Sequence, residues 1–248
     1  AFLCGASMAG IYRGVIWQAS SSGEREDILA SLPILSRKDI FEAMNLAPVC
    51  EQPSLALEVR SDNEPLKICF LSRISPMKNL DYALSVLGQV ASKVIFTIYG
   101  PKEVPSYWAE CEGLIAELPA NVEVHYAGQV LPGDVKTLLS KHHLFFLPTR
   151  GENYGHVIHE ALSAGLPILI SDRTPWGGVV EHGCGWVFSL DDPACFARCI
   201  DDFAGWTTDR VHIAKERAVV FARERAVDKG ILDANRNLFL RAMNGEFS

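Results

Sequence analysis

The chain has 248 residues, with 23 lysines and arginines against 30 aspartates and glutamates, which gives a formal net charge of −7. Hydrophobic residues make up 48% and charged residues 21% of the chain, a balance that excludes a disordered or collagen-like protein. The length predicts a globular protein of one large domain, or of one domain and part of a second. The negative charge disfavours a nucleic-acid-binding protein, because phosphate contacts call for a basic surface.

The cysteines and the hydropathy indicate a compartment. Seven cysteines are scattered along the chain without a C-x-x-C pair, which argues against a zinc ribbon. Thiols in apolar runs, such as Cys69, are typical of a reducing environment. No stretch approaches the roughly 20 apolar residues of a membrane span. We therefore expect no transmembrane segment and a cytoplasmic location, or peripheral membrane attachment in a longer protein.

The N-terminal quarter predicts few elements. A strand is expected at residues 14–19 and a helix from Ser22. Because one strand and one or two helices cannot form a core, residues 1–53 must pack on something else. Residues 54–65 mix Pro, Glu, Ser, Asp and Asn without periodicity, which is typical of a linker.

From residue 66 the pattern becomes a regular alternation of short apolar runs and helical segments. This alternation predicts an α/β fold with a doubly wound parallel sheet, and uninterrupted apolar runs indicate strands buried on both faces. Strands are predicted at 67–72, 94–99, 122–126, 144–147, 167–170 and 185–188, and helices at 79–91, 106–118, 132–141, 155–165 and near Val179. Only helices follow, at 193–204, 208–225 and 228–243.

Several common functional motifs are missing. Gly5 and Gly10 have the spacing of P-loop glycines, but no Lys-Ser/Thr pair follows. No G-x-G-x-x-G follows the strand at 67–72, which weakens a dinucleotide oxidoreductase interpretation. His156, His159 and Glu160 lie close together but match neither H-E-x-x-H nor H-x-x-E-H, so we predict no metal site.

Two strand-end segments carry the chemistry, because ligands of such sheets bind where the strands end. In the first, Arg73 and Lys78 lie five residues apart on the loop after the strand at 67–72, so both can converge on one anion. A guanidinium fork combined with an ammonium point charge suits a diphosphate.

The second segment contains two glutamates. Glu152 precedes a predicted helix and Glu160 lies inside it. If the helix starts near Gly155, the amides of Gly155, His156 and Val157 are free donors and form an anion site. The Cα–Cβ bond of Glu160 leans back toward that end, where its carboxylate can accept hydrogen bonds from a ribose diol. Glu152 then lies on the other side of the phosphates.

These motifs together resemble the retaining glycosyltransferases of the GT-B fold, family four (glycosyl transferases group 1). The resemblance rests on Arg73 and Lys78 in an S-R-x-S-P-x-K-N loop, followed by Glu152 and Glu160 in an E-x7-E pattern, and it covers about residues 66–204. Supporting matches are Gly100, residues 128–130, Pro148-Thr149 and residues 160–168.

The resemblance implies one Rossmann-like half of a GT-B fold. Residues 66–227 are then the C-terminal, donor-binding domain, residues 1–53 are a remnant of the acceptor-side domain that lacks its glycine-rich loop, and residues 228–248 are a crossover helix. The isolated chain is expected to be weak or inactive because most of the acceptor side is absent. The acceptor would be a sugar or a lipid-linked molecule.

The resemblance also implies roles for single residues. Arg73, Lys78 and Glu152 would be catalytic in the transfer of a hexose from UDP- or GDP-hexose, with Glu152 on the sugar hydroxyls. Glu160 would bind the ribose, Gln129 and Val130 the base edge, and Gly100, Gly155, His156 and Val157 would complete the donor site. No cofactor is required, although Mg²⁺ can assist; the sequence has no D-x-D motif of the Mn²⁺-dependent transferases.

Two alternatives remain open from the sequence. A sugar-nucleotide epimerase of the GT-B type would share the fold and the donor pocket, since fold does not determine function. A non-catalytic nucleotide-binding fragment would share the binding residues.

Overall fold

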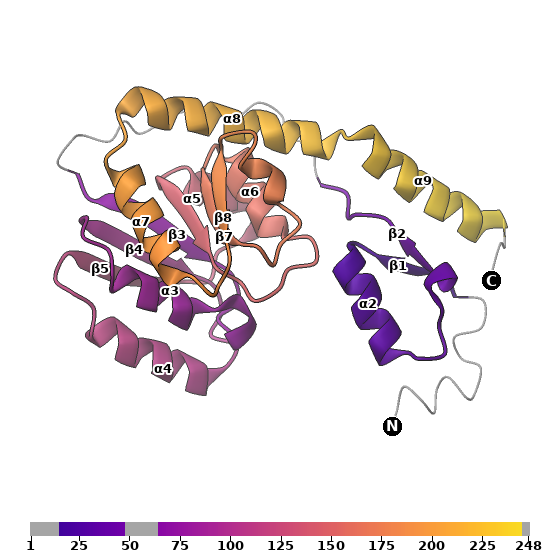
Figure 1. Cartoon of the computed structure of the whole chain (residues 1–248), viewed down its shortest axis with the longest axis horizontal. Helices are drawn as coiled ribbons and strands as arrows, with labels where there is room; N and C mark the ends of the chain where they lie inside the picture. The colour runs from indigo at the N-terminus through magenta and orange to yellow at the C-terminus, as the bar shows by residue number, and fades with distance from the viewer. Residues whose placement is uncertain (1–14, 48–63, 245–248) are drawn as a thin grey trace. The chain divides into compact units, whose positions relative to one another are not determined.

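The computed structural model describes residues 15–47 and 64–244. The chain divides into two compact units, one formed by residues 1–49 with 224–248 and the other by residues 50–223 (Figure 1). The predicted linker lies outside the described residues, apart from its last two positions. The functional division of the chain into domains remains a prediction.

The smaller unit contains a short parallel strand pair. Strand β1 (Trp17–Ala19) is followed by helix α2 (Ser22–Ser31), a 3-10 turn η1 (Arg37–Asp39) and strand β2 (Ile40–Glu42). The two strands pair in parallel, as a strand–helix–strand unit requires. The sequence predicted β1 and α2 but not β2. Helix α9 (Lys229–Asn244) belongs to the same unit, where Asn235 donates a hydrogen bond of 2.8 Å to the carbonyl of Met44.

The larger unit is built on a six-stranded parallel sheet of strand order β5-β4-β3-β6-β7-β8 (Figure 1). This confirms the predicted doubly wound α/β fold. The strands are β3 (Leu66–Leu71), β4 (Val94–Tyr99), β5 (Val122–Gly128), β6 (Leu144–Leu147), β7 (Ile168–Ser171) and β8 (Gly185–Phe188). Every residue of β6 and β7 is buried, as expected for strands covered on both faces.

Helices cover the sheet. Helix α3 packs against α4 and α7, and α5 packs against α6, as alternating crossovers of a doubly wound sheet require. The helices are α3 (Leu80–Leu87), α4 (Pro105–Ala116), α5 (Val135–Leu139), α6 (His156–Ser163), α7 (Pro193–Ala204) and α8 (Thr208–Ala226), with 3-10 turns η2 (Pro76–Lys78), η3 (Pro132–Asp134) and η4 (Gly177–Val179). None of the described helices is long and apolar enough to cross a membrane.

Helices α3 and α5 differ most from their predicted lengths. Helix α3 ends at Leu87 because Gly88, a poor helix former, follows, whereas the apolar pattern extended to residue 91. The segment predicted as one helix at 132–141 is a 3-10 turn followed by the five-residue α5. Both changes lie in connections and leave the strands in their predicted places.

Candidate functional site

The order of the strands marks one place for a ligand. The chain builds outward from β3 to β4 and β5, then returns to the other side of β3 with β6, so the connections after β3 and β6 diverge. Ligands of doubly wound sheets bind at this switch point, outside the carboxyl ends of the strands. Both predicted motif segments, the loop after β3 and the loop after β6, lie there.

A pocket of about 330 Å³ opens at this sheet edge. It gathers residues from the ends of three strands, from the turn η3 and from helices α5 and α6, so segments separated by up to 89 positions in the chain (71 to 160) share one surface. Its lining consists of Leu71, Ser72, Arg73, Gly100, Pro101, Gln129, Val130, Pro132, Val135, Val157 and Glu160.

Gly100 permits the ends of β3 and β4 to approach each other. Its φ is +130°, and a Cβ placed there would lie 1.8 Å from the carbonyl oxygen of Ser72. No side chain fits at that distance, and L-residues rarely adopt this φ. The pocket floor at this point is therefore backbone only.

Arg73 reaches the pocket but is held by a carboxylate. Its Nη1 lies 2.6 Å from Oε1 of Glu103, and both side chains are largely exposed. The sequence predicted that Arg73 and Lys78 converge on one anion. That convergence remains a prediction; in the structure each cation has its own carboxylate partner, Glu103 for Arg73 and Glu152 for Lys78.

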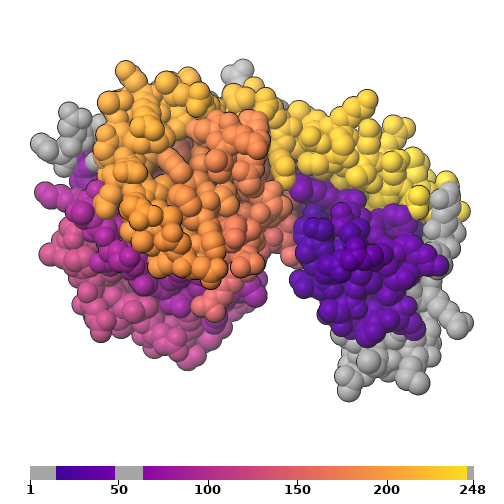
Figure 2. Space-filling view, in the orientation of Figure 1, coloured from indigo at the N-terminus to yellow at the C-terminus, as the bar shows by residue number. Residues whose placement is uncertain are grey.

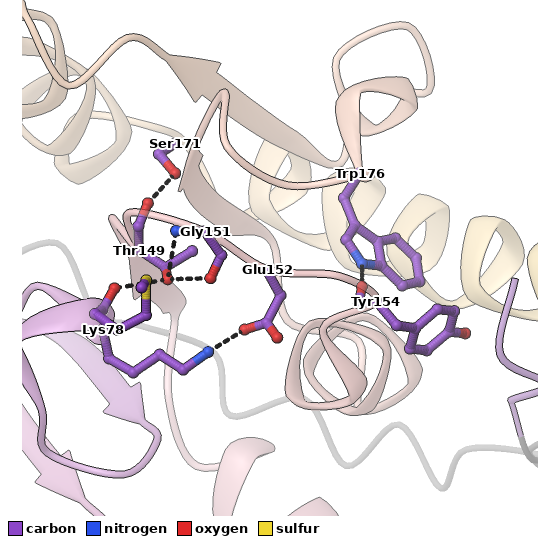
Figure 3. A network of polar contacts seen from close by, with 8 residues as sticks. Lys78, Thr149, Gly151, Glu152, Tyr154, Ser171 and Trp176 are labelled. Atoms are coloured by element: carbon purple, nitrogen blue, oxygen red, sulfur yellow. Dashed lines mark hydrogen bonds and ion pairs between the residues drawn. The ribbon is translucent and has the colours of Figure 1, made fainter. Parts of the chain in front are cut away.

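Lys78 forms an ion pair with Glu152 across the switch point (Figure 3). Its Nζ lies 2.5 Å from Oε2 of Glu152, and the side chains are only 11% and 18% exposed. The sequence predicted Glu152 on the other side of the phosphates from Glu160, near the group that they carry; in the structure Glu152 contacts Lys78 directly. A buried ammonium requires such a counter-charge.

Hydrogen bonds fasten the two loops to each other (Figure 3). The hydroxyl of Thr149 lies 3.0 Å from the carbonyl oxygen of Met77 and 2.9 Å from that of Gly151. Asn79, next to Lys78, donates 2.9 Å to the carbonyl of Pro148, and its own Oδ1 accepts from Nε of Arg150 at 2.9 Å. The ammonium of Lys78 and the carboxylate of Glu152 are therefore positioned by a common scaffold.

Helix α6 begins at His156, as the motif predicted within one residue. Gly155 is its N-cap with φ +83°, and an added Cβ would lie 2.9 Å from Ile158 Cδ1 and 3.0 Å from Glu152 Cγ. In the described part of the chain, no hydrogen bond is made by the amides of Gly155, His156 and Val157. These amides can therefore donate hydrogen bonds to an anion.

Glu160 contributes a half-buried carboxylate to the pocket. Burial raises the pKa of this carboxyl, and the charge of His156, one turn earlier, lowers it in part. No hydrogen bond or ion pair of its carboxylate occurs among the described residues. A desolvated acceptor that faces a pocket without a protein partner is suited to hydroxyl groups of a ligand.

His159 has a packing role. It is buried, and its Nε2 lies 3.3 Å from the carbonyl oxygen of Ala222, which connects α6 to α8. Within the ranges that the structure describes, no three His, Cys, Asp or Glu side chains are grouped so as to hold a metal ion.

Comparison with known proteins decides the family. Residues 54–216, more than half of the chain, match the family described as glycosyl transferases group 1. The chain belongs to this family. No curated protein sequence matches it.

Solved GT-B glycosyltransferases have the same fold as this group 1 chain. A glycosyltransferase from Rickettsia africae aligns with a TM-score of 0.74 and 15% identity, over 96% of this chain and 67% of that protein. TarM from S. aureus, solved as a mutant with fondaparinux, alpha-GlcNAc-glycerol and UDP, aligns with a TM-score of 0.67 and 19% identity over 90% of this chain. Anabaena Alr3699/HepE, solved with UDP-glucose, aligns with a TM-score of 0.68 and 19% identity over 92% of this chain and 63% of that protein. The chain spans 43% of the length of TarM.

Some of the predicted site residues lie together in the pocket of this group 1 glycosyltransferase chain, and others do not. Arg73, Gly100, Gln129, Val130, Val157 and Glu160 line it, whereas Lys78, Glu152, Gly155 and His156 lie outside its lining. Sequence reasoning missed Glu103, which pairs with Arg73, and it noted Asn79 and Thr149 as motif residues without their positioning role. It also left Ser72 and Pro101 out of the site, although their place directly after two strands was a signal.

Proposed function

We propose that this chain binds the nucleoside diphosphate sugar donor of a retaining hexosyltransferase and corresponds to the C-terminal, donor-binding domain. Family membership supports glycosyl transfer. The observation that carries the proposal is the pocket at the switch point, in which a guanidinium and an unpartnered half-buried carboxylate face the same space. A phosphate suits the first group and a ribose diol suits the second.

The proposed roles follow from this placement. Arg73 and the free amides at the start of α6 bind the diphosphate, with Glu160 on the ribose and Gln129 and Val130 beside the base. As the bond between sugar and phosphate breaks, negative charge grows on the departing diphosphate, and prearranged donors stabilise that charge. These residues would do so without a required cofactor, with Mg²⁺ as an optional aid.

Lys78 and Glu152 act as a pair in this proposal. When the diphosphate binds, its oxygens offer Lys78 a second anionic partner beside Glu152, and the ammonium can bridge both. The carboxylate of Glu152 then lies next to the phosphates, where a sugar attached to them would place its hydroxyl groups. Holding the sugar in this orientation lowers the free-energy barrier of transfer, because the sugar is already positioned for attack by the acceptor.

Calorimetric titration tests the binding roles. We expect UDP or GDP to bind more tightly than its monophosphate, and Glu160→Gln to weaken the diphosphate and its sugar conjugate by a similar factor, since the ribose contact is uniform binding. Glu152→Gln should not weaken the bare diphosphate and should weaken the nucleotide sugar. Equal affinities for the mono- and diphosphate would contradict the proposed phosphate site. If Glu152→Gln weakened the bare diphosphate and Glu160→Gln did not, the roles of the two glutamates would have to be interchanged.

An activity assay tests the transfer. The 248-residue chain should hydrolyse or transfer little, since acceptor-side residues are expected mostly from a further domain. Retention would be read from the anomeric configuration of product formed by a full-length protein. Epimerised nucleotide sugar in the same assay would favour the epimerase instead, and addition of Mg²⁺ or a chelator would measure the metal contribution. Free thiols at all described cysteines agree with a proposed cytoplasmic location.

A further inference from the structure

A second pocket lies at the other edge of the larger unit. It has a volume of about 260 Å³ and shares no lining residue with the pocket at the switch point. Strand β8 ends the sheet on this side, and helix α7 and the first turn of α8 complete the walls. The α7 segment, orange in Figure 2, lies at the surface of the unit in this view.

Aromatic rings form the base of this edge pocket. Trp186 and Phe188, two positions apart on β8, point to the same side of the strand, and Trp206 follows α7. The Trp186 and Trp206 rings have centroids 5.3 Å apart and are tilted by 59°. All three lining rings are partly exposed, whereas Phe203 behind them is fully buried. The rings therefore offer apolar surface to a ligand and are not closed into the core.

Two guanidinium groups border these rings. Arg210 lies over Trp206, with its Cζ 3.8 Å from the ring centroid. Arg198 donates from Nη2 to the Sγ of Cys195 at 3.0 Å, and a thiol is only a weak acceptor. Among the residues that the structure describes, neither arginine has a carboxylate within ion-pair distance. Both line the pocket and retain unused N–H donors.

One carboxylate completes the lining. Asp202 lies one helical turn beyond Arg198 on α7, and no ion pair of its side chain occurs in the described ranges. The lining of the edge pocket thus combines donors, an acceptor and aromatic faces, with two positive charges against one negative; Asp192, outside the lining, accepts from the Sγ of Cys195 at 2.9 Å. A hydroxyl group can accept from an arginine and donate to an aspartate, and the C–H face of a sugar ring is apolar enough to lie on an indole.

We propose that the edge pocket binds one carboxylate-bearing sugar unit, such as a uronic acid residue of a glycan. An inorganic anion would leave the aromatic surface unused and would be repelled by Asp202. A purely apolar ligand would leave three charged groups without partners. A neutral sugar would match the hydroxyl-binding groups but not the surplus positive charge, which a carboxylate neutralises through a bidentate guanidinium contact. This proposal stands independently of the donor pocket.

Saturation-transfer NMR and calorimetry with trigalacturonate, cellotriose and sulfate test it on the whole chain. We expect trigalacturonate to bind at millimolar concentrations, with cellotriose weaker and sulfate weaker still. Arg210→Gln should reduce the affinity for trigalacturonate about fivefold, the range for one exposed charge contact. Arg223→Gln removes the same charge from an exposed position further along α8 and should change nothing.

Other outcomes would overturn the proposal. They are the absence of trigalacturonate binding, equal binding of cellotriose, sulfate binding as tight as the trisaccharide, and equal losses in Arg210→Gln and Arg223→Gln. Circular dichroism checks the fold of each variant, and Arg198→Gln, on a different helix, provides a second test if Arg210→Gln is misfolded. UDP affinity should be the same in all three variants, so failure of the donor-site proposal would be seen separately.

Discussion

At the scale of single residues, Arg73 has one partner in the protein and is proposed to have another in the ligand. Its Nη1 is paired with Glu103, so this carboxylate competes with a phosphate for the guanidinium. Exposed pairs of this kind contribute about 0–1 kcal/mol, so the competition is worth up to about fivefold in affinity. If Arg73 binds the diphosphate as proposed, Glu103 weakens that binding.

We therefore predict that Glu103→Gln increases the affinity for UDP by about two- to fivefold at low ionic strength. The gain should shrink as salt is added, since exposed charges are screened. Titration calorimetry at two salt concentrations measures both effects. Glu110→Gln, which removes an exposed carboxylate from the neighbouring helix α4, is the matched control. If Glu110→Gln increased the affinity for UDP equally, the effect would come from the net charge of the protein and not from the pair with Arg73.

Glu160 gives a prediction in which binding and stability move in opposite directions. Burial raises the pKa of its carboxyl in the folded protein, so the unfolded chain is more ionised between the two pKa values, and stability falls as the pH rises through that window. Glu160→Gln removes this cost. At pH 8 we expect a melting temperature at or above that of the unmodified chain.

Glu160→Gln should also reduce the affinity for UDP by roughly tenfold, which corresponds to the loss of one charged hydrogen bond of about 1.5 kcal/mol. In the unmodified chain, UDP affinity should fall on acidification, beginning at a higher pH than for an ordinary glutamate, because protonation removes an acceptor. Calorimetry from pH 8 downward follows this. A pH-independent affinity, or a variant that loses stability without losing UDP, would contradict the assignment.

The sequence singled out Arg73, Lys78, Glu152 and Glu160 as candidate site residues but did not indicate their partners in the fold. The first three follow strand ends, and Glu160 lies in the helix after the second loop. The ion pair between Lys78 and Glu152 joins residues 74 positions apart, and that between Arg73 and Glu103 joins residues 30 apart. Spacing within one loop carries no information on which distant loop lies nearest, so these pairs needed the tertiary structure.

At the scale of elements, the start of α6 depends on one glycine. Gly155→Ala would force an alanine to φ +83° and bring its Cβ to 3.2 Å or less from Ile158, Glu152 and Trp176. Left-handed backbone alone costs about 1–2 kcal/mol. We predict a total destabilisation of roughly 2–4 kcal/mol by chemical denaturation, together with weaker UDP binding as the anion-binding amides are displaced.

Gly128 is the matched control for this prediction. Its φ of +79° is nearly the same, and nothing lies within 4 Å of an added Cβ. Gly128→Ala should therefore show only the backbone cost of about 1–2 kcal/mol. If the two substitutions destabilise the chain equally, the crowding at the start of α6 has no energetic weight.

The predicted strands were accurate where burial on both faces made long apolar runs, as at residues 144–147. Strand β2 was missed because its three residues are too few to show a period, and it is recognisable only through its pairing with β1. Helix α5 was drawn too long because the apolar spacing at 132–141 does not distinguish a 3-10 turn from a first helical turn.

At the scale of the whole molecule, ligand binding should be visible as stability. A ligand present at about 100 times its dissociation constant adds roughly 2.7 kcal/mol to a site that forms only in the folded state. For a unit of this size we expect UDP to raise the melting temperature by about 5–10 °C, measured by calorimetry. Glu160→Gln should require more UDP for the same rise. An unchanged melting temperature at saturating UDP would contradict binding to the folded chain.

The all-parallel sheet has a kinetic consequence. Neighbouring strands β3 and β6 pair Ile68 with Leu144, so a long stretch of chain must be closed before they meet, and such non-local pairings form slowly. The pocket needs β3, β4, β5 and α6 together, whereas helices can form within microseconds. During refolding, the helical signal should therefore recover well before the capacity to bind nucleotide, and nucleotide added early would find few molecules able to hold it.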